Sequence, residues 1–337
     1  MNNILLSADW HLTDNDIEKY RWNVFDVLIK TSIENQVNTI ILSGDIFDRR
    51  DKHPGTLINS FINAILDIKQ KINAEILILA GNHDTPLKNT YYWSFLNSIG
   101  IKYIWNPELF NDVYLLPFSP NPVEDWKELD FNNVKAIIMH QTIAGAVVDG
   151  DRVITDAPHP MPKLPDIPIY SGDIHRPQFI QGVTYIGVPH PTRFSEDWPN
   201  RFLLINDVDW STYKEIPIES IRRCVLEISN AAVLNQTEFK KGDQLRIKFK
   251  LTNRGLALWP TEEQAIREWA KQKEVTIVSI EAILVDNIDT SIPTSNAEID
   301  AGVELMPADQ IIRTFGEEES LSQEIIDFGI KLVQECQ

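Results

Sequence analysis

The sequence predicts an α/β fold whose parallel strands end in side chains that can bind metals or donate protons. Short apolar runs, often β-branched, alternate with segments of helical periodicity along the first part of the chain. Five of these runs lead directly into Asp or His motifs. With 337 residues, 43% of them hydrophobic, the chain can bury a substantial core, and its length suits one large domain with a smaller one attached.

Two helices are predicted between the first three strands. One lies around Ile17–Ile33, and the other follows the start signal Pro54-Gly55, with apolar residues three or four positions apart from Leu57 to Ile72. Strands separated by helices imply parallel pairing through crossover connections, which places ligand chemistry at the carboxyl ends of the strands. The predicted strands are Ile4–Ser7, Thr39–Ser43, Glu75–Ala80, Lys135–Met139, Pro168–Ser171, Thr184–Gly187 and Arg201–Ile205.

The apolar pattern changes after Pro217, and we predict a domain boundary near residues 215–220. The expected division is a main domain over residues 1–215, a smaller α+β capping domain over residues 216–290 and a C-terminal segment over residues 291–337. The elements expected in the smaller domain are the strands Cys224–Ile228, Leu245–Leu251 and Val275–Val285 and the helix Glu262–Lys273.

Two further segments have a distinctive composition. The segment Asp149–Asp166 is rich in Pro and Asp and has no sustained period, which predicts a long loop. The tail Ser320–Glu335 has the apolar spacing of an amphipathic helix. That helix either packs on its own domain or binds a partner.

The charge balance argues against a protein that coats DNA by itself. The formal net charge is -18 and the pI is ≈ 4.8, whereas Lys and Arg contacts to phosphates supply most non-specific affinity for DNA. A nucleic-acid substrate must therefore be held locally, by metals or by a partner. We interpret the last two of three basic clusters as ordinary solvated faces. The clusters are Arg49-Arg50-Asp51-Lys52-His53, Arg222-Arg223 and Lys240-Lys241.

The sequence predicts neither secretion nor a membrane span. The start, from Met1 to Asp9, has no basic region and reaches a carboxylate early, and no apolar stretch attains the ~18–20 residues of a membrane helix. The two cysteines, Cys224 and Cys336, lie far apart and outside any motif, which argues against a disulfide framework, a zinc ribbon or a cysteine nucleophile. We therefore expect a soluble protein of the reducing cytoplasm.

The five motifs that follow apolar runs hold four of the seven histidines of the chain. A single His at a strand end is most often structural, but five such coincidences in chain order predict a site. The motifs are Asp9-Trp10-His11, Gly44-Asp45, Gly81-Asn82-His83-Asp84, His140 and Gly172-Asp173-Ile174-His175.

The residue types and spacings of these motifs point to metal chemistry. Asp9 and His11, two residues apart, can point the same way from an extended strand end. The glycine before Asp45 relieves the backbone at a turn, after which Asp45 can bridge two cations with its two oxygens. Asp84 can orient the imidazole of His83 through the second ring nitrogen.

Mixed oxygen and nitrogen ligands favour Mn²⁺, with Mg²⁺ or Fe as the other candidates, over a thiolate-seeking metal. The motifs offer eight candidate ligand groups, which is more than a single metal ion needs. Two metals about 3.5–4 Å apart activate a bridging water and neutralise the charge on a pentavalent phosphorus transition state. The sequence therefore predicts metal-assisted hydrolysis of phosphoesters.

The motifs, in this order, resemble the calcineurin-like metallophosphoesterases and, within that superfamily, the SbcD-type nucleases. The likeness covers about residues 1–210 well and the remainder only in plan. It implies a metallophosphoesterase-type two-sheet core flanked by helices, with a small α+β capping domain. The likeness to the nuclease branch lies in Gly44-Asp45-Ile46-Phe47-Asp48 followed by Pro54, in Ile174-His175-Arg176-Pro177-Gln178, and in Tyr185-x-Gly187 leading to Phe194-Ser195-Glu196.

The resemblance also implies a role for each site residue. His83 would stay off the metals and protonate the leaving sugar oxygen, with Asp84 orienting it; a positioned general acid typically contributes ~10²–10⁴-fold to the rate. One metal would be held by Asp9, His11, Asp45 and His175, and the second by Asp45, Asn82, His140 and Asp173.

One residue departs from the family pattern. Asp173 stands where the family usually has His, so the site should be about one charge unit more negative. A carboxylate there still ligates Mn²⁺ or Mg²⁺ and favours harder cations over Zn²⁺. The alternative interpretation is that Asp173 caps the turn after Gly172.

Three functions are compatible with these residues: a DNA phosphodiesterase, a phosphatase or small-substrate phosphodiesterase, and an inactive scaffold. The resemblance implies a two-metal DNA phosphodiesterase, an exonuclease or endonuclease of a DNA repair or recombination complex. It would work as a homodimer with an SMC-like ATPase of the SbcC type, in a bacterial cell or a phage-infected host. The third function, of a different class, is a catalytically silent scaffold.

The second function is a metallophosphatase or a small-substrate phosphodiesterase. It is prompted by the run from Gly44 to Arg49, which also resembles the phosphoprotein phosphatases. Those enzymes usually continue with Gly where this chain has Arg50, and they have Glu where this chain has Asp84. Both differences favour the nuclease.

Overall fold

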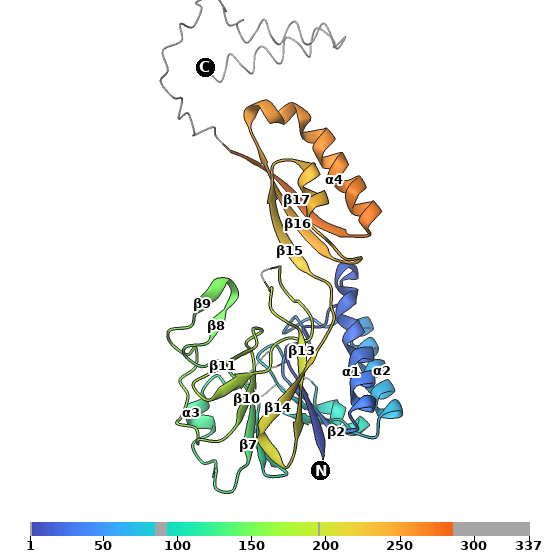
Figure 1. Cartoon of the computed structure of the whole chain (residues 1–337). Coiled ribbons are helices and arrows are strands. Elements are labelled where there is room, and N and C mark those ends of the chain that lie inside the picture. The colour runs from blue at the N-terminus through green and yellow to red at the C-terminus, as the bar shows by residue number, and fades with distance from the viewer. Residues whose placement is uncertain (1, 85–92, 195, 286–337) are drawn as a thin grey trace, which may run out of the picture. The chain divides into compact units, whose positions relative to one another are not determined.

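Two six-stranded sheets face each other in the computed structural model, which describes residues 2–84, 93–194 and 196–285 (Figure 1). The first sheet has the strand order β14-β13-β1-β2-β3-β4, and the second has the order β11-β12-β10-β7-β6-β5. The expected two-sheet α/β core is therefore confirmed. The first sheet comprises β1 (Asn3–Ser7), β2 (Val37–Ser43), β3 (Glu75–Leu79), β4 (Lys102–Ile104), β13 (Arg201–Asn206) and β14 (Asp209–Pro217). The second comprises β5 (Glu108–Phe110), β6 (Val113–Leu116), β7 (Ala136–His140), β10 (Ile169–Gly172), β11 (Gln178–Ile180) and β12 (Val183–Tyr185).

The central strands of the first sheet are buried on both faces. Its strands β1, β2 and β3 pair in parallel, as expected for strands joined by helices. Alternate side chains point to opposite faces, so Leu5 and Ile40 pack against the helices while Leu6 and Ile41 pack against the second sheet. Burial on both sides explains why these strands are almost continuously apolar in sequence.

Two helices, α1 (Val24–Glu34) and α2 (Gly55–Lys71), cover the outer face of the first sheet (Figure 1). The prediction of one helix around Ile17–Ile33 was wrong in its first half, because Asp16–Asn23 form a 3₁₀ segment before α1 begins. Within that segment Arg21 donates to the backbone carbonyl of His11, which ties the chain entering α1 to the end of β1.

The outer face of the second sheet is covered by loops and the short helix α3 (Pro122–Asp125). The predicted loop over Asp149–Asp166 is partly ordered into a hairpin. Its strands β8 (Val147–Val148) and β9 (Arg152–Val153) pair antiparallel. Gly150, with φ +66°, allows the tight turn between them.

A third sheet contains β15 (Arg223–Ile228), β16 (Gln244–Leu251) and β17 (Thr276–Leu284), all parallel, and it packs with α4 (Trp259–Lys273) around a separate hydrophobic cluster. These elements agree with the strands and helix predicted for a capping domain, and the boundary near residues 215–220 stays a prediction. The tail helix Ser320–Glu335 and the segment 291–337 lie outside the described residues. No helix within the described part of the chain has the length and apolar character needed to cross a membrane.

Candidate metal centre

The carboxyl ends of five strands meet where the two sheets face each other, and the predicted site residues lie there. Strands β1, β2 and β3 come from the first sheet, and β7 and β10 come from the second. Asp9 and His11 follow β1, Asp45 follows β2, Asn82, His83 and Asp84 follow β3, His140 ends β7, and Asp173 and His175 follow β10.

The carboxylate of Asp45 lies between two groups of imidazoles. Its Oδ1 atom is 3.4 Å from Nε2 of His140. Its Oδ2 atom is 3.7 Å from Nε2 of His11 and 4.0 Å from Nε2 of His83. The two oxygens of one buried carboxylate therefore face different imidazoles, His140 on one side and His11 and His83 on the other.

Three overlapping groups of potential ligands lie around Asp45. In each group the ligand atoms lie within 4.8 Å of one another, and the groups are Asp9, His11 and His175; His11, Asp45 and His83; and Asp9, Asp45 and His140. The Nε2 atoms of His11 and His175 are 3.1 Å apart. Residues that are far apart in sequence thus form one compact cluster of oxygen and nitrogen atoms.

Asp173 lies at the margin of this cluster. Its Oδ1 atom is 3.8 Å from Nε2 of His140, and its other oxygen accepts a hydrogen bond from the Thr142 hydroxyl. Its backbone N–H donates to Oδ1 of Asp9 over 3.0 Å. The side chain faces β7 and the cluster, which argues against the alternative that it only caps its own turn.

Several buried polar atoms of the cluster have no hydrogen-bond partner among the described residues. They include Oδ2 of Asp9, Oδ1 of Asn82 and Nε2 of His140. Buried polar atoms almost always have a partner, and carboxylate, amide and imidazole atoms are the usual ligands of divalent cations. The residues therefore fit the divalent metals that the sequence predicts.

The second ring nitrogen fixes the orientation of two of the imidazoles. Nδ1 of His140 donates to the carbonyl of Ser43 over 2.6 Å, and Nδ1 of His175 donates to Oε1 of Glu196 over 2.5 Å. Each contact turns Nε2 into the cluster, where it can act as a ligand once it is deprotonated. Sequence analysis assigned no role to Ser43 or Glu196, although Glu196 stands in a run that resembles the nucleases.

The segment that carries Glu196 is tied down by two buried arginines. Thr192 donates to Glu196 from its backbone N–H over 2.5 Å and from its hydroxyl over 2.7 Å. The Thr192 carbonyl accepts hydrogen bonds from Arg21 and from Arg223, and both arginines pair with Glu18. The interpretation of Arg223 as part of a solvated face was wrong, because its side chain is 5% exposed and links the third sheet to this segment.

The expected pairing of Asp84 with the His83 ring was also wrong. The buried Asp84 carboxylate accepts backbone N–H bonds from Asp45 and Gly81, at 2.7 and 2.9 Å, and so fixes the loop that carries Asp45. Nδ1 of His83 contacts the carbonyl of Asp48 instead, over 2.6 Å. A buried carboxylate is stabilised by the backbone N–H groups that donate to it, which explains why Asp84 does not reach the ring.

Left-handed backbone conformations aim several of the candidate ligands. Asp9, His11, Asp45 and Asp173 have φ values of +55°, +43°, +54° and +75°. Asp9 and His11 therefore converge through a tight turn and not, as predicted, through the alternation of an extended strand. Such conformations cost about 1–3 kcal/mol each and concentrate at functional sites.

Burial and mutual charge shift the acid–base properties of the cluster. Burial raises the pKa of Asp9 to about 7, and the charges of Asp45 and Asp173 add to this effect, while His140 opposes it. Burial alone would raise the pKa of Asp45, but His140 and the neighbouring imidazoles outweigh it and hold that pKa below its usual value. The pKa of His140 is correspondingly raised well above its usual value by Asp45, despite burial.

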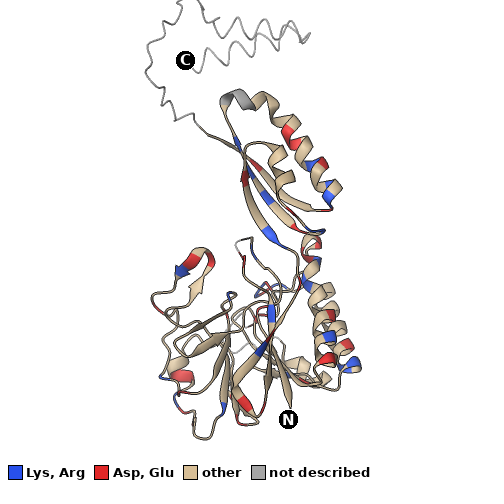
Figure 2. Ribbon diagram, viewed as in Figure 1, with Lys and Arg blue, Asp and Glu red and all other residues tan. Residues whose placement is uncertain are grey.

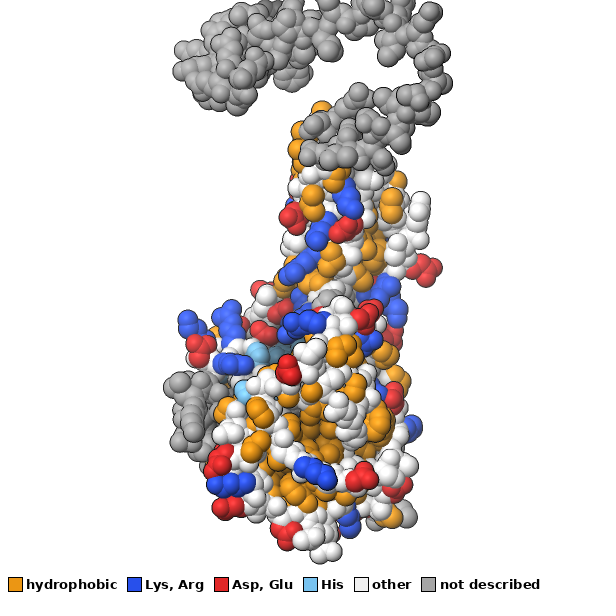
Figure 3. All heavy atoms as spheres, turned by 90° about the vertical axis from the view of Figure 1, so that its left-hand side faces the viewer, with side chains coloured by type: hydrophobic (Ala, Val, Ile, Leu, Met, Phe, Trp, Pro, Cys, Tyr) orange, Lys and Arg blue, Asp and Glu red, His pale blue; other side chains and the backbone are white. Residues whose placement is uncertain are grey.

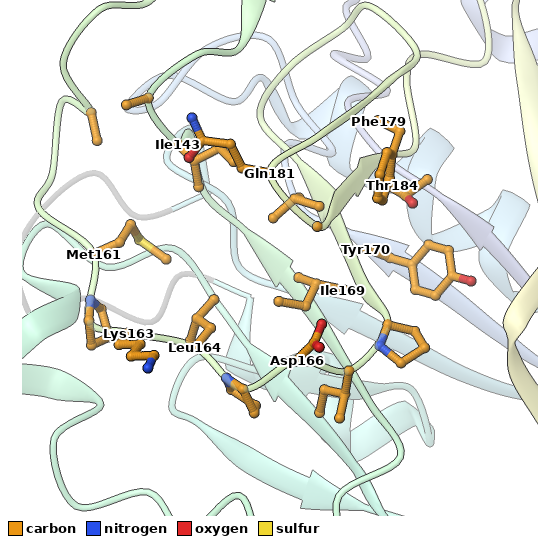
Figure 4. A pocket seen from close by; sticks show the side chains of 18 of the residues that line it. Ile143, Met161, Lys163, Leu164, Asp166, Ile169, Tyr170, Phe179, Gln181 and Thr184 are labelled. Carbon is orange, nitrogen blue, oxygen red and sulfur yellow. The ribbon is translucent and has the colours of Figure 1, made fainter.

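A large apolar pocket of the described residues lies away from this cluster, along the second sheet. It has a volume of about 1000 Å³ and is lined by residues such as Met161, Leu164 and Tyr170 (Figure 4). It contains none of the predicted site residues. The chemistry therefore belongs to the strand ends.

Residues 3–177 match the calcineurin-like phosphoesterases, over more than half of the 337 residues. The chain belongs to this family. All of the predicted site residues fall within the matched segment, and the protein is a metal-dependent hydrolase of phosphoester bonds.

Individual relatives match smaller parts of this phosphoesterase. SbcD, a component of the nuclease SbcCD, is 35% identical to it over 88 residues in both Escherichia coli K12 and Escherichia coli O157:H7, which is 24% of this chain and 21% of each relative. The chain thus matches about a fifth of the length of these relatives. The crystal structure of Pseudomonas putida nuclease MPE aligns with a TM-score of 0.31 at 14% identity, over 64% of this chain and 87% of that one.

Substitution of Gly44 by Ala is expected to damage the centre. A Cβ at this position would lie 2.2 Å from Nδ1 of His140, and the backbone has φ +84°. We expect a loss of about 2 kcal/mol or more in the free energy of unfolding, together with weaker Mn²⁺ binding. Thermal denaturation with and without Mn²⁺ measures both. Gly55→Ala is the matched control, because nothing lies within 4 Å of its added Cβ; equal effects of the two changes would contradict the steric argument.

Mn²⁺ is expected to bind about tenfold more tightly at pH 8 than at pH 6. Because the pKa of Asp9 is raised to about 7, its carboxyl holds a proton below that pH and must lose it to act as a ligand. The pKa of His140 is also raised, so a proton on its imidazole likewise competes with the metal at the lower pH. Isothermal titration calorimetry in buffers of different ionisation enthalpy measures the affinity and the protons released. Equal affinities at both pH values would show that these ligands are already deprotonated in the metal-free protein.

Proposed function

We propose that this phosphoesterase is a two-metal DNA phosphodiesterase, and the position of Asp45 is the observation that carries the proposal. One carboxylate whose two oxygens face different imidazole groups is suited to bridging two cations. In this proposal one metal is held by Asp9, His11, Asp45 and His175, and the second by Asp45, Asn82, His140 and Asp173.

The metals favoured by this ligand set are Mn²⁺ ions, with Mg²⁺ or Fe as alternatives. When bound, the two cations supply an activated water and neutralise charge that develops on the phosphorus. The residues of the chain hold these ions at a buried strand edge, where Asp45 is 3% exposed and His140 is fully buried. Burial strengthens each electrostatic contact made there.

We assign the role of general acid to His83. Its Nδ1–H donates to the carbonyl of Asp48, so Nε2 lies on the side that faces Asp45, and the imidazolium form carries on Nε2 the proton that a general acid donates. The side chain is 29% exposed, more than those of His11 and His140, so a substrate can reach it. Asp84 supports the acid by holding the surrounding loop and not by touching the ring.

The choice of DNA as substrate rests on the resemblance and on local similarity. The 35% identity over 88 residues is to a protein named as part of the nuclease SbcCD. On that basis the partner is an SMC-like ATPase of the SbcC type, and the chain acts as a homodimer in DNA repair or recombination, in the cytoplasm of a bacterial or phage-infected cell. A partner would supply the DNA affinity that a net charge of -18 denies this chain.

His83→Gln is expected to lower kcat on DNA by ~10²–10⁴-fold in Mn²⁺, with Mn²⁺ affinity retained. The loss should be much smaller on bis(p-nitrophenyl) phosphate, because p-nitrophenolate leaves without needing a proton. The assay uses end-labelled duplex DNA, the aryl diester and an aryl monoester, with His159→Gln as a control outside the site. Hydrolysis of the monoester alone would support the phosphatase instead, and failure to bind Mn²⁺ would support the scaffold.

Asp173→Ala is expected to abolish nuclease activity with Mn²⁺, because it removes a ligand of the second metal. Asp173→His, which introduces the residue usual in the family, should retain activity and shift the metal preference towards Zn²⁺. Activity and bound metal are measured across a series of divalent cations. Near-normal turnover of the alanine variant would remove Asp173 from the ligand set.

A further inference from the structure

A small pocket adjoins the metal centre on the side of Asp173 and His175. Its volume is about 220 Å³, and the β8–β9 hairpin, the segment after β10 and the segment around Trp198 form its walls. The lining combines three arginines, one tryptophan and aliphatic side chains with the carboxylates of Asp149 and Asp173. The residues that matter here are Arg152, Arg176, Arg193, Trp198, Val148 and Ile154.

The arginines of this pocket are available to a phosphate group. Arg193 pairs with the half-buried Asp149 over 3.0 Å, and Arg176 pairs with the exposed Asp151; both aspartates lie in the turn of the hairpin. Arg152 is exposed and has no ion pair among the described residues. Exposed ion pairs contribute little free energy, so an anionic ligand can replace the aspartates at small cost.

The arrangement of charges around the hairpin is visible from two directions. Figure 2 shows acidic and basic residues side by side at the hairpin tip. Figure 3 shows Lys and Arg side chains near exposed histidine atoms, with acidic side chains among them. Arg176 and Arg193 line the same pocket as Asp173 and His175, so in a chain of net charge -18 positive charge adjoins the candidate metal centre.

The tryptophan and its neighbours add a surface that fits a nucleobase. Trp198 lines the pocket with Val148 and Ile154. An indole face stacks on any base, because every base has a π-face. Bases inside a duplex have both faces covered by their neighbours, so only an unpaired base can enter so small a pocket.

We infer that this pocket binds an unpaired nucleotide next to the scissile phosphodiester, with its base on Trp198 and its phosphates on Arg152, Arg176 and Arg193. The inference rests on the proposed phosphodiesterase and specifies its substrate as single-stranded or frayed DNA. Duplex DNA would then be cut where its ends open, and the pocket would select the nucleotide presented to the metals.

Direct binding tests the inference without requiring turnover. A fluorescein-labelled oligothymidylate and a blunt duplex are titrated in Ca²⁺ buffer and followed by anisotropy. The wild-type protein should bind the single strand about tenfold more tightly than the duplex, and Trp198→Ala should remove that difference, whereas Trp198→Phe should keep most of it. Equal binding of both DNAs by the wild type, or no change in Trp198→Ala, would overturn the inference.

The arginines are tested with a matched pair of variants. Arg193→Gln should weaken single-strand binding and lower the salt dependence by about 0.7 in the log–log slope. Arg267→Gln is the control, because Arg193 and Arg267 are 63% and 59% exposed and both are ion-paired. A smaller effect of Arg193→Gln than of the control would exclude a phosphate contact.

A second measurement separates this inference from the proposed function. Two substrates are compared in Mn²⁺, the p-nitrophenyl ester of thymidine 5′-monophosphate and bis(p-nitrophenyl) phosphate. The ratio of their kcat/KM values, nucleotide ester over simple diester, should fall about tenfold in Trp198→Ala. The ratio cancels any loss of active protein. Hydrolysis of both esters with an unchanged ratio would refute the pocket alone, and absence of hydrolysis by the wild type would refute the proposed function while the anisotropy result stands.

Discussion

A buried carboxylate held between imidazoles is the constraint on which the rest of this structure depends. Asp45 is 3% exposed, with His140 beside one oxygen and His11 and His83 nearest the other. An unpaired charge at such a position would cost many kcal/mol, so strands from both sheets must stay in register at this edge. The position of Asp45 also requires glycine at residue 81, since a Cβ on Gly81 would lie 2.2 Å from Oδ1 of Asp45.

The central strands of the fold could be predicted because both of their faces are buried, which leaves a short continuous apolar run. The strands at the edges carry a weaker signal. β14 spans nine residues, of which only Trp210 is buried, and β4, β5 and β11 have three residues each, too few to establish a period. β6 was not predicted, although its sequence VYLL is wholly buried and has the same apolar pattern as the predicted strands.

The candidate ligands could be predicted because each one follows a strand, and parallel strands bring their carboxyl ends together. The contacts that hold these ligands in place could not be predicted, because they join segments that are far apart in sequence and no local pattern encodes them. Glu196 reaches His175 across 21 positions, and Asp84 binds amides 38 and 39 positions away in preference to its neighbour His83. Arg223 stands in a basic pair typical of a surface, and its contacts with Glu18 and with the Thr192 carbonyl explain its burial.

In the proposed function, the cluster that would hold the metals does not attract DNA without them. Asp9, Asp45 and Asp173 bring three carboxylates to one site, and a phosphodiester approaching it adds further negative charge. Two divalent cations would reverse the local sign, so in the proposed function metal binding precedes substrate binding on electrostatic grounds. The pocket arginines then extend that positive region away from the metals. An acidic chain can in this way hold a nucleic acid at one place while the rest of its surface disfavours binding elsewhere.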